Sequence, residues 1–146
     1  MNWIKIVVVS LCLSMFSFSS VLAVQTWTAQ DLKAVTRLIN TMKTDKNFNN
    51  RRKAAMELGL IGHPQAIDQL LFSLERDAFD DVRIASANSL GRINKPGVAK
   101  RLLLSFKRNK GRTDVQVAII GAIGNMRKNA TDVAPYMVQL LKHKSP

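Results

Sequence analysis

Residues that could carry out acid–base chemistry or bind a metal are few among the 146 residues of this sequence. The two histidines, His63 and His143, are far apart in the chain, and neither has a carboxylate or a second histidine at the spacing of a metal site. Asp80 and Asp81 are the one pair of adjacent carboxylates, and they stand in a short polar link between helical patterns. The sequence therefore predicts no metal ion and no cofactor.

Groups suited to nucleophilic catalysis are equally sparse. A reactive serine, threonine or cysteine needs a neighbouring base and a third residue that orients the base. The serines are scattered without such a trio, and the single cysteine, Cys12, lies in the N-terminal segment. The spacings Gly59–Gly62 and Gly121–Gly124 do not match a phosphate-binding loop and instead predict close helix packing and turns. We therefore expect a non-enzymatic protein that acts through its surface.

The elements that form this surface belong to an internal repeat. Gly59, Gly91 and Gly124 align at steps of 32 and 33 residues. Matching apolar residues flank each glycine, and aliphatic residues follow at positions i, i+3, i+4 and i+7, the spacing of one helix face. A partial copy without its first half precedes them. Because one helix pair cannot bury its own apolar face, the units must stack on one another.

This pattern predicts an all-α fold, a short α-solenoid of about three and a half helix pairs. The predicted domain covers residues 24–146 and comprises a half repeat at 28–44 and repeats at 50–76, 82–108 and 114–143. Thr28 and Asp31 match the capping box that opens a helix. Pro64 and Pro96 suit the first turn of a helix, where a missing N–H costs nothing. The seven helices are expected near residues 28–43, 50–61, 64–76, 82–93, 96–108, 114–127 and 132–143.

The repeat resembles a known family. Its best copy reads VRIASANSLGRINKP from residue 82, which is similar to the short HEAT repeats of phycobilin lyase subunits. The other copies depart from the motif at Asn50, Gln116 and Asn129. The resemblance implies the fold over residues 28–143 and an inner, concave face lined by the second helices. The sequence Asp81 followed by Arg83 also resembles the family's pattern for Asp–Arg contacts between repeats. The resemblance does not imply an activity, because this repeat serves many functions.

The outward positions of the second helices form rows across the units. These rows bring arginines, a tyrosine and exposed apolar side chains onto the face that the resemblance makes concave. Arginine and tyrosine are favoured in protein interfaces, and exposed large apolar residues often mark a binding site. The alternative is that the arginines are only solvated and that Phe72 packs on a neighbour. The predicted partner-binding residues are Arg37, Gln69, Phe72, Arg76, Arg101, Leu104, Arg108 and Tyr136.

Positive charge is concentrated in the middle of the chain. Residues 24–81 contain eight basic and eight acidic residues, whereas residues 82–112 contain nine basic residues and no acidic residue. This block predicts a basic patch rather than uniform basicity. Its candidate residues are Lys95, Lys100, Lys107, Lys110 and Arg112.

The first 23 residues have the pattern of a secretory signal peptide. One lysine precedes a 13-residue apolar stretch, and small residues at Val21 and Ala23 predict cleavage after Ala23. The stretch is shorter than the roughly 20 residues of a membrane-spanning helix, so an uncleaved anchor is the less favoured alternative. The mature chain lacks cysteine, which is compatible with the bacterial periplasm or secretion for a domain that folds without disulfides.

These observations leave three hypotheses for function. The favoured one is an exported binding or scaffold module that holds a protein partner, with an acidic surface, on its concave face. The alternative is binding of an anionic lipid, lipopolysaccharide or cell-wall polymer by the basic block at 82–112. Nucleic-acid binding and a role on a chromophore are disfavoured by the export signal and by the absent cysteine, respectively. The polar C-terminus predicts a closed end and a monomer.

Overall fold

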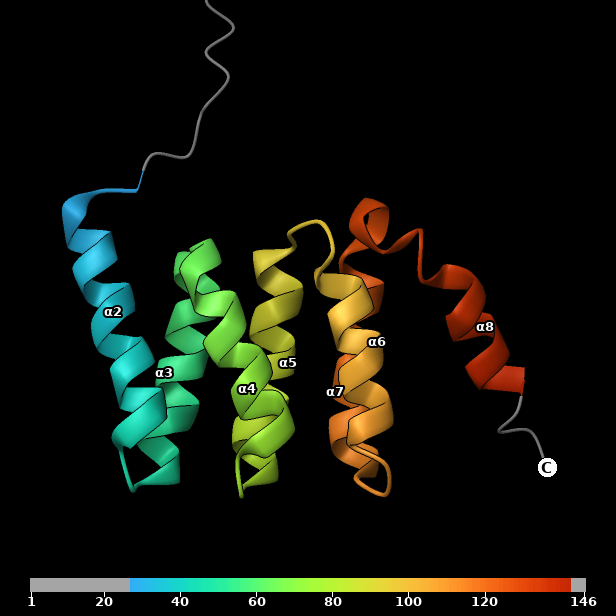
Figure 1. Ribbon diagram of the computed structural model, residues 1–146, viewed down its shortest axis with the longest axis horizontal. Helices are drawn as coiled ribbons and strands as arrows, with labels where there is room; N and C mark the ends of the chain where they lie inside the picture. Colours follow the sequence, from blue (N-terminus) through green and yellow to red (C-terminus); the bar gives the residue numbers. More distant parts are fainter. Residues whose placement is uncertain (1–26, 143–146) are drawn as a thin grey trace, which may run out of the picture.

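The computed structural model describes residues 27–142, so the predicted signal peptide and His143 lie outside the described residues. This part of the chain contains seven α-helices and no strand, which confirms the predicted all-α solenoid (Figure 1). Short 3-10 turns at Pro64–Ala66 and Arg127–Ala130 precede two of the helices. The helices are α2 (Ala29–Thr44), α3 (Phe48–Ile61), α4 (Ile67–Arg76), α5 (Asp80–Ile93), α6 (Val98–Arg108), α7 (Thr113–Asn125) and α8 (Ala134–Lys142).

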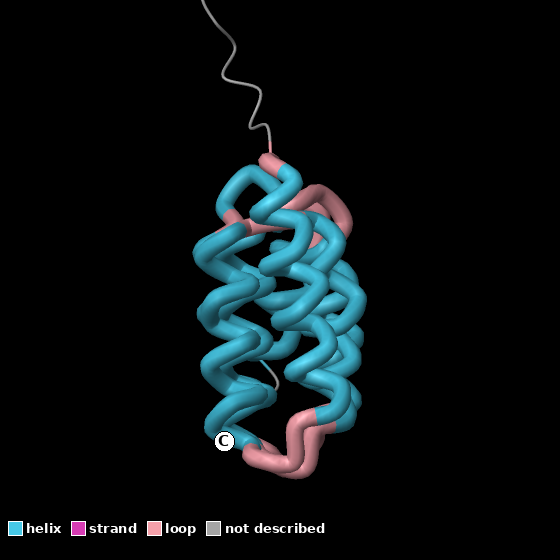
Figure 2. The backbone as a smooth tube through the Cα atoms, turned by 90° about the vertical axis from the view of Figure 1, so that its left-hand side faces the viewer, coloured by secondary structure: helices cyan, strands magenta, loops and turns pink. Residues whose placement is uncertain are grey.

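The helices form two layers (Figures 1 and 2). The first helices α3, α5 and α7 pack side by side in one layer, and the second helices α2, α4 and α6 lie in the other. Each of these second helices packs chiefly on the first helix of the following unit: α2 on α3, α4 on α5 and α6 on α7. The outward surface of α2, α4 and α6 is called the second-helix face below. No helix within residues 27–142 is long and apolar enough to span a membrane.

The apolar stripes predicted by the repeat form the core between the two layers. Leu58, Leu90 and Ile123, which precede the three aligned glycines, are all buried. The second helices contribute Leu70, Leu74 and Leu102, which are fully buried. Burying a leucine side chain contributes about 1.5–3 kcal/mol, so the repeated stripe accounts for both the layer order and the register of the stack.

Five predicted helix starts differ from the structure by two or three residues: α3 and α5 begin earlier than predicted, α4 begins later, after the 3-10 turn at Pro64–Ala66, and α6 and α8 also begin later. The capping box of Thr28 and Asp31 opens α2 as expected. The helix predicted from residue 96, however, begins at Val98, because Gly97 has a φ of 81° and interrupts the helical backbone after Pro96. The last helix begins at Ala134 rather than near 132, after a 3-10 turn that starts at Arg127, where φ is 45°.

Arginines of the first helices tie successive second helices together. Arg51 donates to the backbone carbonyls of Asp45 and Lys46, after α2, and forms a two-bond ion pair with Asp77, after α4. The two-bond geometry is the stronger form of such pairs. Of the Asp–Arg contacts expected between repeats, the pair of Arg51 and Asp77 is present, whereas Arg83 donates instead to Asn109, after α6, and to the carbonyl of Asp77. Arg83 and Asn109 are both buried.

The two departures in the third copy have structural roles. Gln116, which replaces this arginine, donates a hydrogen bond to the carbonyl of Phe106. Asn129, which replaces the proline, donates to the backbone and side-chain oxygens of Asn94, at 2.8 and 3.0 Å, in the turn of the preceding unit. The third unit is therefore joined to the second, but α8 lacks the arginine tie that the earlier second helices have.

The Arg51–Asp77 pair predicts a specific acid dependence of stability. Burial alone would raise the pKa of Asp77, but hydrogen bonds from Arg51 and the Phe79 amide, and the charges of Arg51 and Arg83, lower it. A carboxyl whose pKa is lowered in the folded state stabilises the fold above its unfolded pKa of about 3.9, and this contribution is lost as the pH falls through the lower folded value.

Asp77→Asn is therefore expected to lower the free energy of unfolding by about 2 kcal/mol near neutral pH, and by much less near pH 3. Urea unfolding of both proteins over this pH range measures the difference. Asp31 and Asp45, whose pKa values are also lowered by hydrogen bonds, are present in both proteins and cancel. A difference that stays constant with pH would contradict the assigned role of the pair.

Candidate binding site on the second-helix face

A groove with a volume of about 270 Å³ runs between α4 and α6 on the second-helix face. Its centre is apolar: Phe72 of α4 is 62% exposed and Leu104 of α6 is 54% exposed, and Leu71 lies at its base. Phe72 and Leu104 occupy the same position of consecutive repeats, which is why the two helices bring them to one groove. Exposed phenylalanine and leucine beside each other are typical of a surface that another molecule covers.

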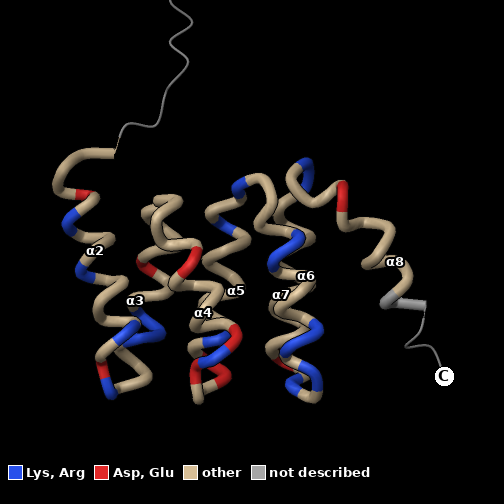
Figure 3. The backbone as a smooth tube through the Cα atoms, in the orientation of Figure 1, with Lys and Arg blue, Asp and Glu red and all other residues tan. Residues whose placement is uncertain are grey.

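Two ion pairs bracket this apolar centre. Arg101 of α6 pairs with Asp68 of α4 at 2.7 Å, and Arg108 pairs with Glu75 at 2.6 Å. These residues lie about one turn before and after Phe72 and Leu104, and Figure 3 shows the acidic positions of α4 beside the basic positions of α6. Two of the arginines that were predicted to bind an acidic partner are thus already matched by carboxylates of the chain itself.

The acidic partners Asp68 and Glu75 were not among the predicted site residues. Each precedes its arginine by 33 residues, one repeat length. A search for opposite charges one repeat apart would have found both pairs. Glu75 is held further by Ser105, whose hydroxyl donates to it at 2.8 Å. These exposed pairs contribute at most about 1 kcal/mol each to stability, so their main effect is on the charge of the groove.

A second groove, about 440 Å³ in volume, lies between α2 and α4. Phe72 borders this groove too, so its ring forms the ridge between the two. The basic residues that line this second groove are Lys43 of α2 and Arg76 of α4. No ion pair within the described residues involves Arg76. The two grooves together offer an apolar centre with a cationic side toward α2.

Not all of the predicted residues share this site. Gln69 was expected on the exposed row but is buried, and its amide donates to Ser73 at 3.2 Å. Arg37 lines a separate, shallow hollow on α2, and Tyr136 is exposed on α8, away from the grooves. The structure therefore brings together Phe72, Arg76, Arg101, Leu104 and Arg108.

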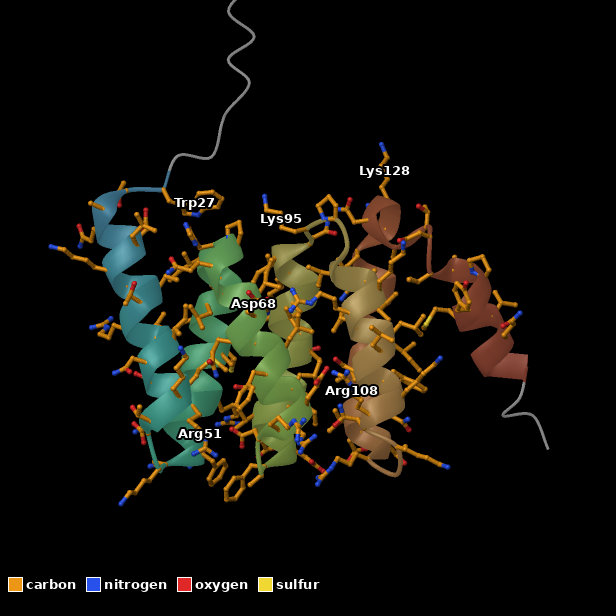
Figure 4. The ribbon with its side chains drawn as sticks, in the orientation of Figure 1. Trp27, Arg51, Asp68, Lys95, Arg108 and Lys128 are labelled. Carbon is orange, nitrogen blue, oxygen red and sulfur yellow. The ribbon has the colours of Figure 1, made fainter. Side chains whose placement is uncertain are left out.

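The predicted basic patch is not one surface. Lys95 lies beside Trp27 at one end of the helices (Figure 4), with its amine 5.8 Å from the indole ring centre. Lys110 and Arg112 follow α6 at its other end, where Arg112 pairs with Asp80. Lys100 pairs with Asp132 at 3.3 Å. Lys107, on α6, is exposed.

The polar groups that line the two grooves are guanidinium and ammonium ions, carboxylates engaged in ion pairs, the Gln69 amide and the Ser73 hydroxyl. Among residues 27–142, no three histidine, cysteine, aspartate or glutamate side chains converge as a metal site would require. The described residues form a short α-solenoid with two grooves on its second helices.

Comparison with known proteins identifies the family. A model of HEAT repeats matches residues 35–112, more than half of the chain, and the protein belongs to the HEAT-repeat family. The matched region runs from α2 to the link after α6 and so contains both grooves. No curated protein matches the chain. HEAT repeats generally mediate protein interactions or act as scaffolds.

Proposed function

We propose that the protein is an exported, non-enzymatic module that holds a protein partner on its second-helix face. The observation that carries this proposal is the exposed pair Phe72 and Leu104, set in a groove between two ion pairs. Buried interfaces combine a central apolar anchor with a polar rim that excludes water. The two grooves have this arrangement before any partner is bound.

The charges of the site favour a partner segment with an apolar side chain flanked by carboxylates. The apolar side chain would cover Phe72 and Leu104. A carboxylate on the α2 side would reach Arg76 and Lys43, which line the second groove. On the α6 side, Arg101 and Arg108 neutralise Asp68 and Glu75 and so keep the groove open to an acidic segment. Acidic groups thus set the specificity and the apolar contact supplies most of the affinity.

The structure gives less support to binding of an anionic envelope polymer by residues 82–112. Five of the nine basic residues in this block have a carboxylate partner: Arg83, Lys100, Arg101, Arg108 and Arg112. Polyanion binding depends on free cations that can release counterions, and this pairing lowers their number. The same observation weakens nucleic-acid binding. Export still depends on the predicted signal peptide and is tested by the N-terminus of the purified mature protein.

Phe72→Asp is expected to weaken partner binding at least tenfold and to leave the melting temperature within about 2 °C, because Phe72 is largely exposed. The matched control is Leu60→Asp, which introduces the same charge at a residue of α3 that is 70% exposed on the other layer. The measurement is cross-linked capture from an envelope extract with quantitative mass spectrometry, followed by titration of the captured protein.

The wild-type protein and the two variants separate the alternatives. A partner that is lost with Phe72→Asp and retained with Leu60→Asp supports the site. Equal capture by all three proteins would place the interface elsewhere. Capture that fails only above about 0.3 M salt, irrespective of Phe72, would favour the polyanion hypothesis.

A further inference from the structure

The C-terminal end of the stack carries a surface distinct from the second-helix face. In the interior, Gly59 of α3 lies against Ser89 of α5, and Gly91 of α5 lies against Ala122 of α7. Gly124 is the third residue of this series, and no atom lies within 4 Å of the place that a Cβ would occupy. The side of α7 that follows the interior pattern is therefore uncovered by the described residues.

Neighbouring residues of α7 show the same difference. Ile120 packs against the core but remains partly exposed, whereas Ala87, at the same position of α5, is fully buried. Val117 is largely exposed, whereas Ile84, its counterpart, packs against the core. The apolar side that is covered on α3 and on α5 is thus not covered on α7 by any described residue.

Helix α8 also lacks, among the described residues, the packing neighbour that its counterpart α6 has. Its residues Ala134 and Val138 are exposed, although their counterparts in α6, Ala99 and Leu103, are buried and half-buried. The reason lies in the packing order, since α2, α4 and α6 each pack chiefly on the first helix of the next unit. Figure 1 shows α8 at the end of the array, beyond α7, with no further helix of the described chain beside it.

We propose that this surface, the terminal cradle of Ile120, Gly124, Ala134 and Val138, binds an amphipathic helix of another protein as an additional first helix. The interior of the stack shows what such a helix needs. The bound helix would need alanine or serine at two positions, those that Ala85 and Ser89 occupy in α5 and Ala118 and Ala122 occupy in α7. Small side chains at these two positions allow the close approach that Gly124 permits, and the cradle continues an interface already used twice in the fold.

A second copy of this chain is a poor occupant. The uncovered leading helix of the stack is α3, and its residues at these two positions are Lys53 and Glu57, both exposed. Head-to-tail stacking would press these charges onto Gly124 and Ile120, and burial of unpaired charge is strongly unfavourable. The corresponding residues of α5 and α7 are already covered inside their own stack. The charges of α3 thus act against open-ended stacking.

The probe for this proposal is a capped synthetic peptide of residues 80–94, the helix that covers Gly59 inside the stack. Titration into the labelled full chain, followed by amide shifts in NMR, is expected to perturb α7 and α8. Gly124→Val is expected to weaken peptide binding at least tenfold, because the valine side chain occupies the space that the peptide would fill. The protein itself should still fold, because no atom lies within 4 Å of the Cβ position. Lys107→Val, at an exposed position of α6 outside the terminal cradle, is the control and should bind normally.

A peptide with the substitutions Ala85→Lys and Ser89→Glu, which imitate α3, is expected to bind at least tenfold more weakly. The proposal is overturned by equal affinity of the two peptides, by unchanged binding to Gly124→Val, by shifts confined to the second-helix face, or by no binding up to the solubility limit. Sedimentation velocity adds the last test, since self-association that Gly124→Val abolishes would make a second copy the occupant.

Discussion

Gly91→Ala should lower the free energy of unfolding by about 2 kcal/mol, although alanine favours a helix over glycine by roughly 1 kcal/mol. A Cβ at residue 91 would lie 2.9 Å from the Cα and 3.0 Å from the carbonyl oxygen of Ala122. These are backbone atoms of α7, which cannot rotate away as a side chain could. One methyl group would therefore separate α5 from α7 and disturb the packing of both units.

The matched control is Gly121→Ala in α7. Residue 121 is also helical, but nothing lies within 4 Å of its Cβ position, so only the helix preference acts. This variant is expected to gain about 0.5–1 kcal/mol. Urea unfolding followed by circular dichroism measures both, with the m-value as a check on two-state behaviour. Stabilisation of both variants would show that α5 and α7 do not approach as closely as described.

The repeat pattern was sufficient to predict the architecture. Aligned glycines with matching apolar neighbours determine the number of units, and the i, i+3, i+4, i+7 stripes determine which side of each helix is buried. Gly59 and Gly91 illustrate why this worked, since one backbone contact recurs at the same position of each interior unit. Gly124 has the same sequence context but a different environment. Its exposure depends on a neighbour, which a local pattern cannot specify.

The candidate site was predicted less completely, for two physical reasons. Position within a helix predicted that Gln69 and Arg101, which are equivalent in the repeat, would both be exposed. The shorter glutamine side chain folds back to Ser73 and is buried, whereas the arginine extends across the groove to Asp68. The sequence analysis counted charge along the chain, whereas ion pairs form between units, so Arg101 and Arg108 meet Asp68 and Glu75 of the preceding unit.

The buried arginine Arg83 is the other residue with a large expected effect. Its guanidinium donates to the carbonyls of Leu74, Glu75 and Asp77, at the end of α4, and to the side-chain oxygen of Asn109 at 2.7 Å. The last carbonyls of a helix have no partner within the helix, so Arg83 satisfies the end of α4. Burial, and then the charge of Arg112, lower the pKa of Arg83.

Arg83→Met should lower the free energy of unfolding by about 3–5 kcal/mol, because it keeps the aliphatic stem but leaves four buried or partly buried acceptors without this donor. Arg112→Met is the control. It removes the same charge from an exposed ion pair with Asp80, for which about 0–1 kcal/mol is expected. Urea unfolding at one pH and salt concentration compares the two. Equal losses of unfolding free energy in the two variants would contradict this role. They would mean that Arg83 stabilises the fold through its charge and not through its hydrogen bonds to the carbonyls at the end of α4.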